Sequence, residues 1–259
     1  MFYAGIDVGS LTAETVIIDE KGAITIYNIL PTGSNARSAA ERSFSQALEG
    51  AGLMKEDITE IVATGYGRSV IDFAPKKITE ITCHARGAIE SFPETRTIID
   101  IGGQDSKVIR VGKAGKVMDF AMNDKCAAGT GRFLEVMARA LEVKLTDMEK
   151  LSALARSEIS ISSICTVFAE SEVVSLIASG EPVENIIAGL HRSVANRVNG
   201  MVRRVGLEEA VTMTGGVAKN KGVIKALEDV LGVHILVPKE PQINGALGAA
   251  LLALEKHGE

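Results

Sequence analysis

Two of the three cysteines in this 259-residue chain stand directly before stretches that favour a helix. Cys126 is followed by a glycine-rich turn, with Thr130 as the predicted N-cap, and then by residues 131–142, whose apolar residues recur at helical spacing. Cys165 precedes residues 166–177, which are apolar at mostly helical spacing. Because a helix N-terminus lowers the pKa of a nearby thiol, both cysteines are candidates for redox or metal chemistry. The alternative is that both are small buried core residues.

Three turns rich in glycine could bind phosphate groups. They are Asp7-Val8-Gly9-Ser10, Asp100-Ile101-Gly102-Gly103-Gln104-Asp105 and Thr214-Gly215-Gly216-Val217-Ala218. Consecutive backbone N–H groups in such turns bind phosphate oxygens, and an Asp at the end of the preceding strand can bind Mg²⁺ directly or through water. Two such turns facing each other across a cleft would hold a triphosphate from both sides. For any single turn, an ordinary tight hairpin is the alternative.

Three residues of these turns are the candidate catalytic residues. Asp7 and Asp100 are predicted to bind Mg²⁺. Gln104 is placed to orient a water molecule on the γ-phosphate, as a glutamine does in other nucleotide hydrolases.

The elements that must position these turns occur twice in the chain. Ile6-Asp7-Val8-Gly9 matches Ile99-Asp100-Ile101-Gly102, 93 residues further along, and Gly22 matches Gly115 at the same offset. Each half also contains a strand that ends in Thr-Gly, at residues 64–65 and 214–215. Between these marks the second half is about 57 residues longer, and the additional length contains both candidate cysteines. The pattern predicts a duplicated domain.

The expected elements place the fold in the α/β class. Strands are predicted at 3–8, 12–19, 23–30, 61–65 and 211–215, and helices at 37–51, 80–92, 131–142, 146–156, 184–205, 219–231 and 243–256. Strands followed by helices in each half predict two related lobes with a ligand cleft between them. We place the first lobe at residues 1–95, with helix 244–259 packing back on it, and the second at 96–243.

Composition excludes several classes of function. A net charge of −5 argues against a nucleic-acid binder, and three scattered cysteines argue against a disulfide framework. The N-terminus lacks the basic region of a signal peptide, and the longest apolar run, 245–254, is too short to span a bilayer. We therefore expect a cytoplasmic protein that has no nucleic-acid or membrane partner.

Several motifs together resemble one known family. They are Gly5-Ile-Asp-Val-Gly-Ser10, Ala63-Thr-Gly-Tyr-Gly-Arg68, Asp100-Ile-Gly-Gly-Gln-Asp105, Asn123-Asp-Lys-Cys-Ala-Ala-Gly-Thr-Gly-Arg-Phe133, Thr166-Val-Phe-Ala-Glu-Ser-Glu172 and Asn244-Gly-Ala-Leu-Gly-Ala249. They resemble the activators (component A) of 2-hydroxyacyl-CoA dehydratases such as 2-hydroxyglutaryl-CoA dehydratase. These are BadF/BadG/BcrA/BcrD-type ATPases of the actin/hexokinase/chaperone superfamily. The resemblance runs essentially from end to end.

The resemblance implies a duplicated actin-like (ribonuclease H-like) ATPase fold with two lobes around a nucleotide cleft. It implies that ATP or ADP binds there with Mg²⁺. The residues expected to contact the nucleotide are Gly9, Ser10, Leu11, Thr12, Ala13, Gly102, Gly103, Gly129, Thr130, Gly215, Gly216, Val217, Asn220 and Gln242.

The resemblance also implies a homodimer with one 4Fe-4S cluster between the subunits, bound by Cys126 and Cys165 of each chain. Such a cluster takes four thiolates, and two per chain around a two-fold axis meet this number. Reduced ferredoxin or flavodoxin would load the cluster, and ATP would drive delivery of the electron to the dehydratase. Cys83 has no counterpart in the cluster motif, and we interpret it as a core residue.

One residue departs from the family pattern. Glu14 stands where a lysine often follows the first phosphate turn, which exchanges a positive for a negative charge near the phosphates. A Glu14 side chain that points to solvent would make this change harmless. None of the four histidines, His84, His191, His234 and His257, shows metal-ligand spacing, and we interpret each as structural.

Two other functions fit part of the pattern. A small-molecule kinase of the same superfamily, such as an amino-sugar kinase, would use Asp100 as a general base and would leave the cysteines incidental. A nucleotide-regulated scaffold, like actin-type filament proteins, would have no redox role.

Overall fold

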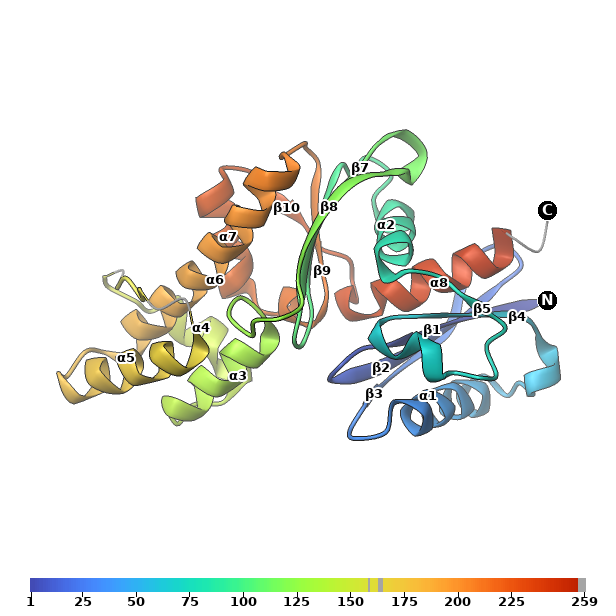
Figure 1. The fold of residues 1–259 in the computed structure, drawn as a ribbon, viewed down its shortest axis with the longest axis horizontal. Coiled ribbons are helices and arrows are strands. Elements are labelled where there is room, and N and C mark those ends of the chain that lie inside the picture. The colour runs from blue at the N-terminus through green and yellow to red at the C-terminus, as the bar shows by residue number, and fades with distance from the viewer. Residues whose placement is uncertain (158, 163–164, 256–259) are drawn as a thin grey trace.

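The computed structural model describes residues 1–255 except 158, 163 and 164, and consists of two lobes, each built on one mixed sheet (Figure 1). The first sheet has the order β3-β2-β1-β4-β5. Its strands are β1 (Phe2–Val8), β2 (Thr12–Asp19), β3 (Ile24–Pro31), β4 (Ile58–Thr64) and β5 (Lys76–Lys77). The second sheet has the order β10-β9-β6-β7-β8. Its strands are β6 (Thr97–Ile101), β7 (Ser106–Val111), β8 (Val117–Asn123), β9 (Val211–Thr214) and β10 (Ile235–Leu236).

The two sheets have the same topology. In the first, β1 pairs antiparallel with β2 and parallel with β4, while in the second β6 pairs antiparallel with β7 and parallel with β9. The matched glycines Gly22 and Gly115 both have positive φ, 82° and 72°. The predicted α/β fold of two related lobes is therefore confirmed.

Eight α-helices lie within the described residues. They are α1 (Ala36–Ala51), α2 (Glu80–Ser91), α3 (Gly131–Ala140), α4 (Met148–Ser152), α5 (Thr166–Ala178), α6 (Val183–Val205), α7 (Lys221–Leu231) and α8 (Asn244–Glu255). Most begin and end within two residues of the predicted bounds. Residue 256, the predicted end of the last helix, lies outside the described residues.

The helix predicted at 146–156 was too long. Only α4 is α-helical there, preceded by a short 3₁₀ turn at Leu145–Asp147. The backbone N–H groups of Arg156 and Ser157 donate to the side-chain oxygen of Asn185 on α6, at 2.9 and 3.3 Å. Because these groups bond to another helix, they do not continue the i→i−4 ladder.

Helix α8 returns from the second lobe to the first sheet, where it packs against β1, β2 and β4 and lies beside α2 (Figure 1). Helix α1 covers the other face of this sheet. The approach of α8 is so close that a Cβ at Gly248 would collide with the Cys83 carbonyl, and one at Gly5 with the Ala246 carbonyl. The chain thus crosses between the lobes twice, before β6 and before α8.

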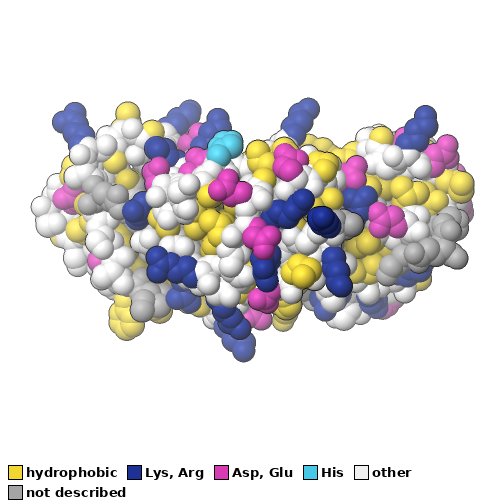
Figure 2. All heavy atoms as spheres, turned by 90° about the horizontal axis from the view of Figure 1, so that it is seen from above, with side chains coloured by type: hydrophobic (Ala, Val, Ile, Leu, Met, Phe, Trp, Pro, Cys, Tyr) yellow, Lys and Arg dark blue, Asp and Glu magenta, His cyan; other side chains and the backbone are white. Residues whose placement is uncertain are grey.

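Within residues 1–255, leaving aside the three undescribed positions, no helix is both long and apolar enough to cross a bilayer. Figure 2 shows one face of the molecule, on which basic and acidic side chains are intermixed. This face therefore presents no extended field of one sign.

Candidate functional site

A cleft with a volume of about 900 Å³ lies between the lobes and contains all three glycine-rich turns. Asp7 pairs with Thr64 and Asp100 with Thr214, so the carboxyl ends of β1, β4, β6 and β9 meet at this cleft. The following predicted residues line it: Asp7, Gly9, Ser10, Leu11, Thr12, Asp100, Gly102, Gly103, Gln104, Gly215, Gly216, Val217, Asn220 and Gln242.

Three predicted nucleotide-binding residues lie elsewhere. Ala13 alternates with Thr12 along β2 and is buried in the core of the first lobe. Thr130 is fully buried at the start of α3, and a Cβ at Gly129 would face the Arg197 side chain. The sequence motif around residues 129–130 therefore shapes the backbone in front of α3.

Asp100 is held by partners on both carboxylate oxygens. Its Oδ1 accepts a hydrogen bond from Thr214 Oγ1 at 2.7 Å and lies 3.3 Å from His84 Nδ1, and its Oδ2 lies 3.2 Å from Lys107 Nζ. Burial raises the pKa of Asp100, but the positive charges of His84 and Lys107 and the Thr214 hydrogen bond lower it, and the net direction is downward. Asp100 is thus an ionised, oriented carboxylate.

The pKa of Asp7 is shifted in the opposite direction from that of Asp100. Asp7 is buried, and burial followed by the charge of Glu14 raises its pKa well above the usual value. The nearest ring nitrogen, His84 Nε2, lies 4.0 Å from Asp7 Oδ2. A divalent cation beside Asp7 would supply the positive charge that favours its ionised form. The two aspartates therefore fit a Mg²⁺ ion bound by one or two carboxylates, water and phosphate.

Two residues of the cleft, Lys107 and His84, were not predicted from the sequence to belong to the site. Lys107 is only 3% exposed and, besides Asp100, contacts Asp105 at 2.8 Å and Glu80 at 3.2 Å. It lies opposite Asp100 in the β6–β7 pairing, so the predicted hairpin could have indicated it. His84, interpreted as structural, lies between Asp7 and Asp100.

The position of His84 depends on contacts between distant segments. The Asn244 side-chain nitrogen on α8 donates to the His84 carbonyl at 3.0 Å and lies 3.3 Å from His84 Nδ1. No local sequence pattern joins α2 to α8. His257 lies outside the described residues, and His234 pairs with Glu228 on the surface.

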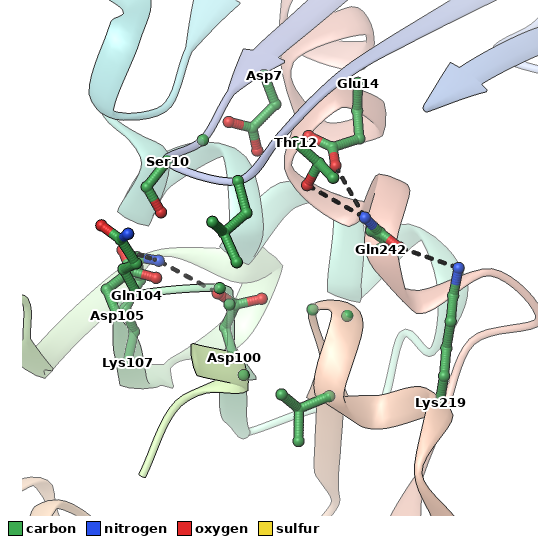
Figure 3. A pocket seen from close by; sticks show the side chains of 18 of the residues that line it. Asp7, Ser10, Thr12, Glu14, Asp100, Gln104, Asp105, Lys107, Lys219 and Gln242 are labelled. Atoms are coloured by element: carbon green, nitrogen blue, oxygen red, sulfur yellow. Dashed lines mark hydrogen bonds and ion pairs between the residues drawn. The ribbon is translucent and has the colours of Figure 1, made fainter. Parts of the chain in front are cut away.

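Glu14 points into the cleft. It is 4% exposed and accepts a hydrogen bond from Gln242 Nε2 at 3.2 Å (Figure 3). Burial raises its pKa to about 7, although the hydrogen bonds from Thr12 and Gln242 lower it. The departure from the family pattern therefore falls inside the site.

Cys126 lies in a loop that is bonded to the second phosphate turn. Asn123 donates to the Cys126 carbonyl at 2.8 Å, and the hydroxyl of Thr130 donates to Ala127 rather than capping α3. The first backbone N–H groups of α3, those of Gly131 and Arg132, donate to the carbonyls of Gly102 and Gly103 at 2.9 and 2.8 Å. The loop and the phosphate turn are thus joined by direct backbone hydrogen bonds.

The three cysteines differ in accessibility, and none forms a disulfide. Cys165 is exposed at the N-cap of α5, which packs against α3, and Cys126 is half-buried. Cys83 is buried in the first lobe, and burial raises the pKa of its thiol to about 12, which confirms it as a core residue. Within the described part of the chain, no three His, Cys, Asp or Glu side chains are arranged to hold a metal ion. One chain thus offers two accessible thiols.

His191 is a buried residue that contacts Asn220 of the cleft wall, and its burial makes the free energy of unfolding depend on pH. Its Nε2 lies 3.2 Å from the side-chain nitrogen of Asn220, whose oxygen caps α7. Burial lowers the pKa of His191 from 6.5 to about 4. The unfolded chain therefore binds the proton first, so the contribution is complete above pH 6.5 and declines as the pH falls towards 4.

Between pH 7 and pH 5 we expect His191 to account for a loss of about 2 kcal/mol in the free energy of unfolding. Urea unfolding at both pH values measures it. In His191→Gln this part of the loss should disappear, while in the control His234→Gln, at an exposed position, it should remain. An unchanged pH dependence in His191→Gln would contradict the assignment.

Comparison with known proteins agrees with this geometry. The model of the BadF/BadG/BcrA/BcrD ATPase family matches residues 4–253. The chain is 51% identical over 255 residues to the activator of lactoyl-CoA dehydratase from Anaerotignum propionicum, covering 98% of both chains.

Two solved structures are also similar. One is component A of (R)-2-hydroxyglutaryl-CoA dehydratase from Acidaminococcus fermentans, with 49% identity, a TM-score of 0.97 and complete coverage of both chains. The other is the activator of 2-hydroxyisocaproyl-CoA dehydratase from Clostridium difficile with bound ADPNP, with 45% identity and a TM-score of 0.95, covering 100% of this chain and 96% of that one. The chain belongs to the BadF/BadG/BcrA/BcrD ATPase family.

Proposed function

We propose that this protein is an ATP-dependent activator of a 2-hydroxyacyl-CoA dehydratase in the cytoplasm. It passes one low-potential electron to the dehydratase from a 4Fe-4S cluster shared by two copies of the chain. Relatives that are 51% and 50% identical activate lactoyl-CoA and (R)-2-hydroxyglutaryl-CoA dehydratases. The electron donor to the cluster is reduced ferredoxin or flavodoxin.

The observation that carries the proposal is the bonding between the second phosphate turn and α3. Gly102 and Gly103 line the nucleotide cleft, and their carbonyls accept the hydrogen bonds of the first N–H groups of α3. A change in this turn on ATP binding or hydrolysis would move the start of α3, and with it the loop that contains Cys126. Nucleotide state can then bias the cysteine loop, provided that ATP and ADP differ in affinity for its conformations.

The cysteines fit a cluster shared by two chains. When bound, the cluster supplies one-electron chemistry at low potential. Cys126 and Cys165 of two chains would provide its four thiolates, since Cys83 is buried and remains a thiol. Cys165 is the N-cap residue of α5, and Cys126 lies in the loop that leads into α3.

A second copy of the chain would cover an apolar face of α5. This helix begins directly after Cys165 and exposes four large apolar side chains: Val167, Phe168, Val174 and Ile177, which are 65%, 70%, 53% and 40% exposed. Burial of such a face between two copies is a usual feature of homodimers.

The residues of the cleft would have separate roles in ATP hydrolysis. Asp7 and Asp100 hold Mg²⁺, while Lys107 and Thr214 keep Asp100 oriented. Gln104 is exposed on the cleft wall and orients the attacking water. A kinase function is less well supported, because Asp100 has a lowered pKa and is occupied by three partners, which makes it a poor general base.

Anaerobically purified protein tests the proposal through its iron and sulfide content, its visible spectrum and ATP-dependent reduction of a dehydratase. We expect a brown protein with about four irons per dimer. A colourless, iron-free protein whose ATP turnover is stimulated by a sugar would instead support the kinase.

Replacing Gln104 by alanine tests the coupling of hydrolysis to electron delivery. We expect ATP hydrolysis to fall on the order of a hundredfold, because the water loses its orienting group. The iron content should not change, since Gln104 belongs to the phosphate turn and not to the cysteine loop. Repeated electron delivery, measured on the same preparations, should fall together with hydrolysis. Normal delivery by a variant without ATPase activity would contradict the coupling.

A further inference from the structure

A chain of polar contacts joins the two lobes on one wall of the cleft (Figure 3). The Nε2 atom of Gln242 donates to Glu14 Oε1 and to Thr12 Oγ1, both at 3.2 Å, on β2 of the first lobe. The Oε1 atom of Gln242 accepts from Lys219 Nζ at 3.0 Å, in the turn that follows β9 of the second lobe. All four residues line the cleft.

This chain of contacts lies where the backbone passes from one lobe to the other. Gln242 is in the 3₁₀ turn Pro241–Ile243, directly before α8, and the carbonyl of Pro241 accepts a hydrogen bond from Gly215 at 2.9 Å. Lys219 is also fixed by Glu240, whose Oε1 lies 2.9 Å from Lys219 Nζ. A movement between the lobes must therefore act on these contacts.

The side-chain amide of Gln242 has a defined orientation between its two partners. Its nitrogen faces an acceptor, Glu14, and its oxygen faces a donor, Lys219. An amide turned by 180° would place its oxygen against the Glu14 carboxylate and its nitrogen against the Lys219 ammonium. The buried carboxylate thus holds the amide in the one orientation that offers an acceptor to Lys219.

The two side chains that Gln242 connects, those of Glu14 and Lys219, have opposite chemical character: one is acidic and the other is basic. Glu14 places a buried carboxyl group beside the first phosphate turn, and Lys219, whose side chain is 46% exposed, offers a positive charge from the opposite lobe. An ammonium held over a cleft attracts phosphate groups only while it is kept in place.

We propose that Glu14 is a positioning residue for nucleotide binding, which acts through Gln242 to hold Lys219 at the nucleotide. We call Glu14, Gln242 and Lys219 the interlobe latch. The inference rests on the nucleotide site of the proposed function, but it involves neither the cluster nor electron delivery.

The test compares two substitutions of Glu14 for which simple electrostatics and the latch predict different results. Removal of a negative charge near phosphates should by itself strengthen ADP binding. The latch predicts that Glu14→Ala instead weakens it, on the order of fivefold, because the Gln242 amide loses its carboxylate acceptor and can turn away, which leaves Lys219 with Glu240 as its remaining partner. Glu14→Gln keeps an acceptor oxygen for Gln242 and should bind ADP as tightly as the unmodified protein or more tightly.

Lys219→Gln should weaken ADP binding on the order of tenfold, and adding Glu14→Ala to it should have no further effect. Matched controls are Lys225→Gln and Glu20→Ala, at exposed positions outside the cleft, which should bind ADP normally. Isothermal titration calorimetry with ADP and Mg²⁺ gives the dissociation constants, and circular dichroism verifies folding.

Tighter ADP binding by Glu14→Ala, or independent effects of Glu14→Ala and Lys219→Gln, would overturn the latch. If the unmodified protein contains no iron or delivers no electrons, the proposed function alone is contradicted, since the measurement of ADP affinity requires neither the cluster nor electron delivery. Absence of ADP binding by the unmodified protein would overturn the nucleotide site and the latch together.

Discussion

Replacing Cys126 by serine is expected to remove the iron of the whole dimer, because each chain supplies half of the cluster ligands. A 4Fe-4S cluster needs four thiolates, and a dimer of this variant would retain only the two Cys165 side chains. The same result is expected for Cys165→Ser. Anaerobic iron and sulfide analysis, with the visible absorption spectrum, measures the loss.

Cys83→Ser is the matched control for both variants. Its thiol is buried in the first lobe behind β1 and α8, so the iron content should remain at about four per dimer. If Cys126→Ser keeps the full iron content, the assignment of the cluster ligands is wrong. The elution volume in gel filtration shows whether the variants still form dimers.

Asp100→Asn is expected to abolish ATP hydrolysis, with a loss of activity on the order of a hundredfold to a thousandfold. The asparagine keeps an oxygen for the Thr214 hydroxyl but removes the charge that binds Mg²⁺ and that neutralises Lys107. Lys107 retains Asp105 and Glu80 as partners, so the fold should persist.

ATPase assays at saturating Mg²⁺ measure this effect, and thermal unfolding separates it from a loss of stability. Asp119→Asn, an exposed change on β8, is the matched control and should leave hydrolysis unchanged. An Asp100→Asn protein that still hydrolyses ATP would show that the roles of the two phosphate turns have been misinterpreted.

The parts of the fold that the sequence predicted are those determined by local pattern. The paired hairpins, the Thr-Gly ends of β4 and β9 and most helices follow from periodicity and turn residues within short segments. The duplication made the prediction stronger, because each hairpin confirmed the other. The helix predicted at 146–156 is shorter in the structure, because the backbone of Arg156 bonds instead to Asn185, a partner about thirty residues away in the sequence.

The parts of the site that the sequence did not predict depend on contacts between distant segments. His84 reaches both aspartates because α8 brings Asn244 against α2. The orientation of Glu14 was left open, since a residue on a hairpin strand can face either side until the partner lobe is placed. Its contact with Gln242 joins residues at opposite ends of the chain.

The docking of α8 on the first sheet also affects the order in which the protein can fold during synthesis. Residues 97–236 contain all strands of the second sheet, so that lobe can close as soon as they have left the ribosome. The first sheet, although translated earlier, keeps one apolar face uncovered until residues 244–255 emerge. During translation of the second lobe the nascent chain therefore lacks the α8 side chains that cover Tyr3, Val16, Ile18 and Val62, and we expect this apolar face to be open to aggregation until α8 is made.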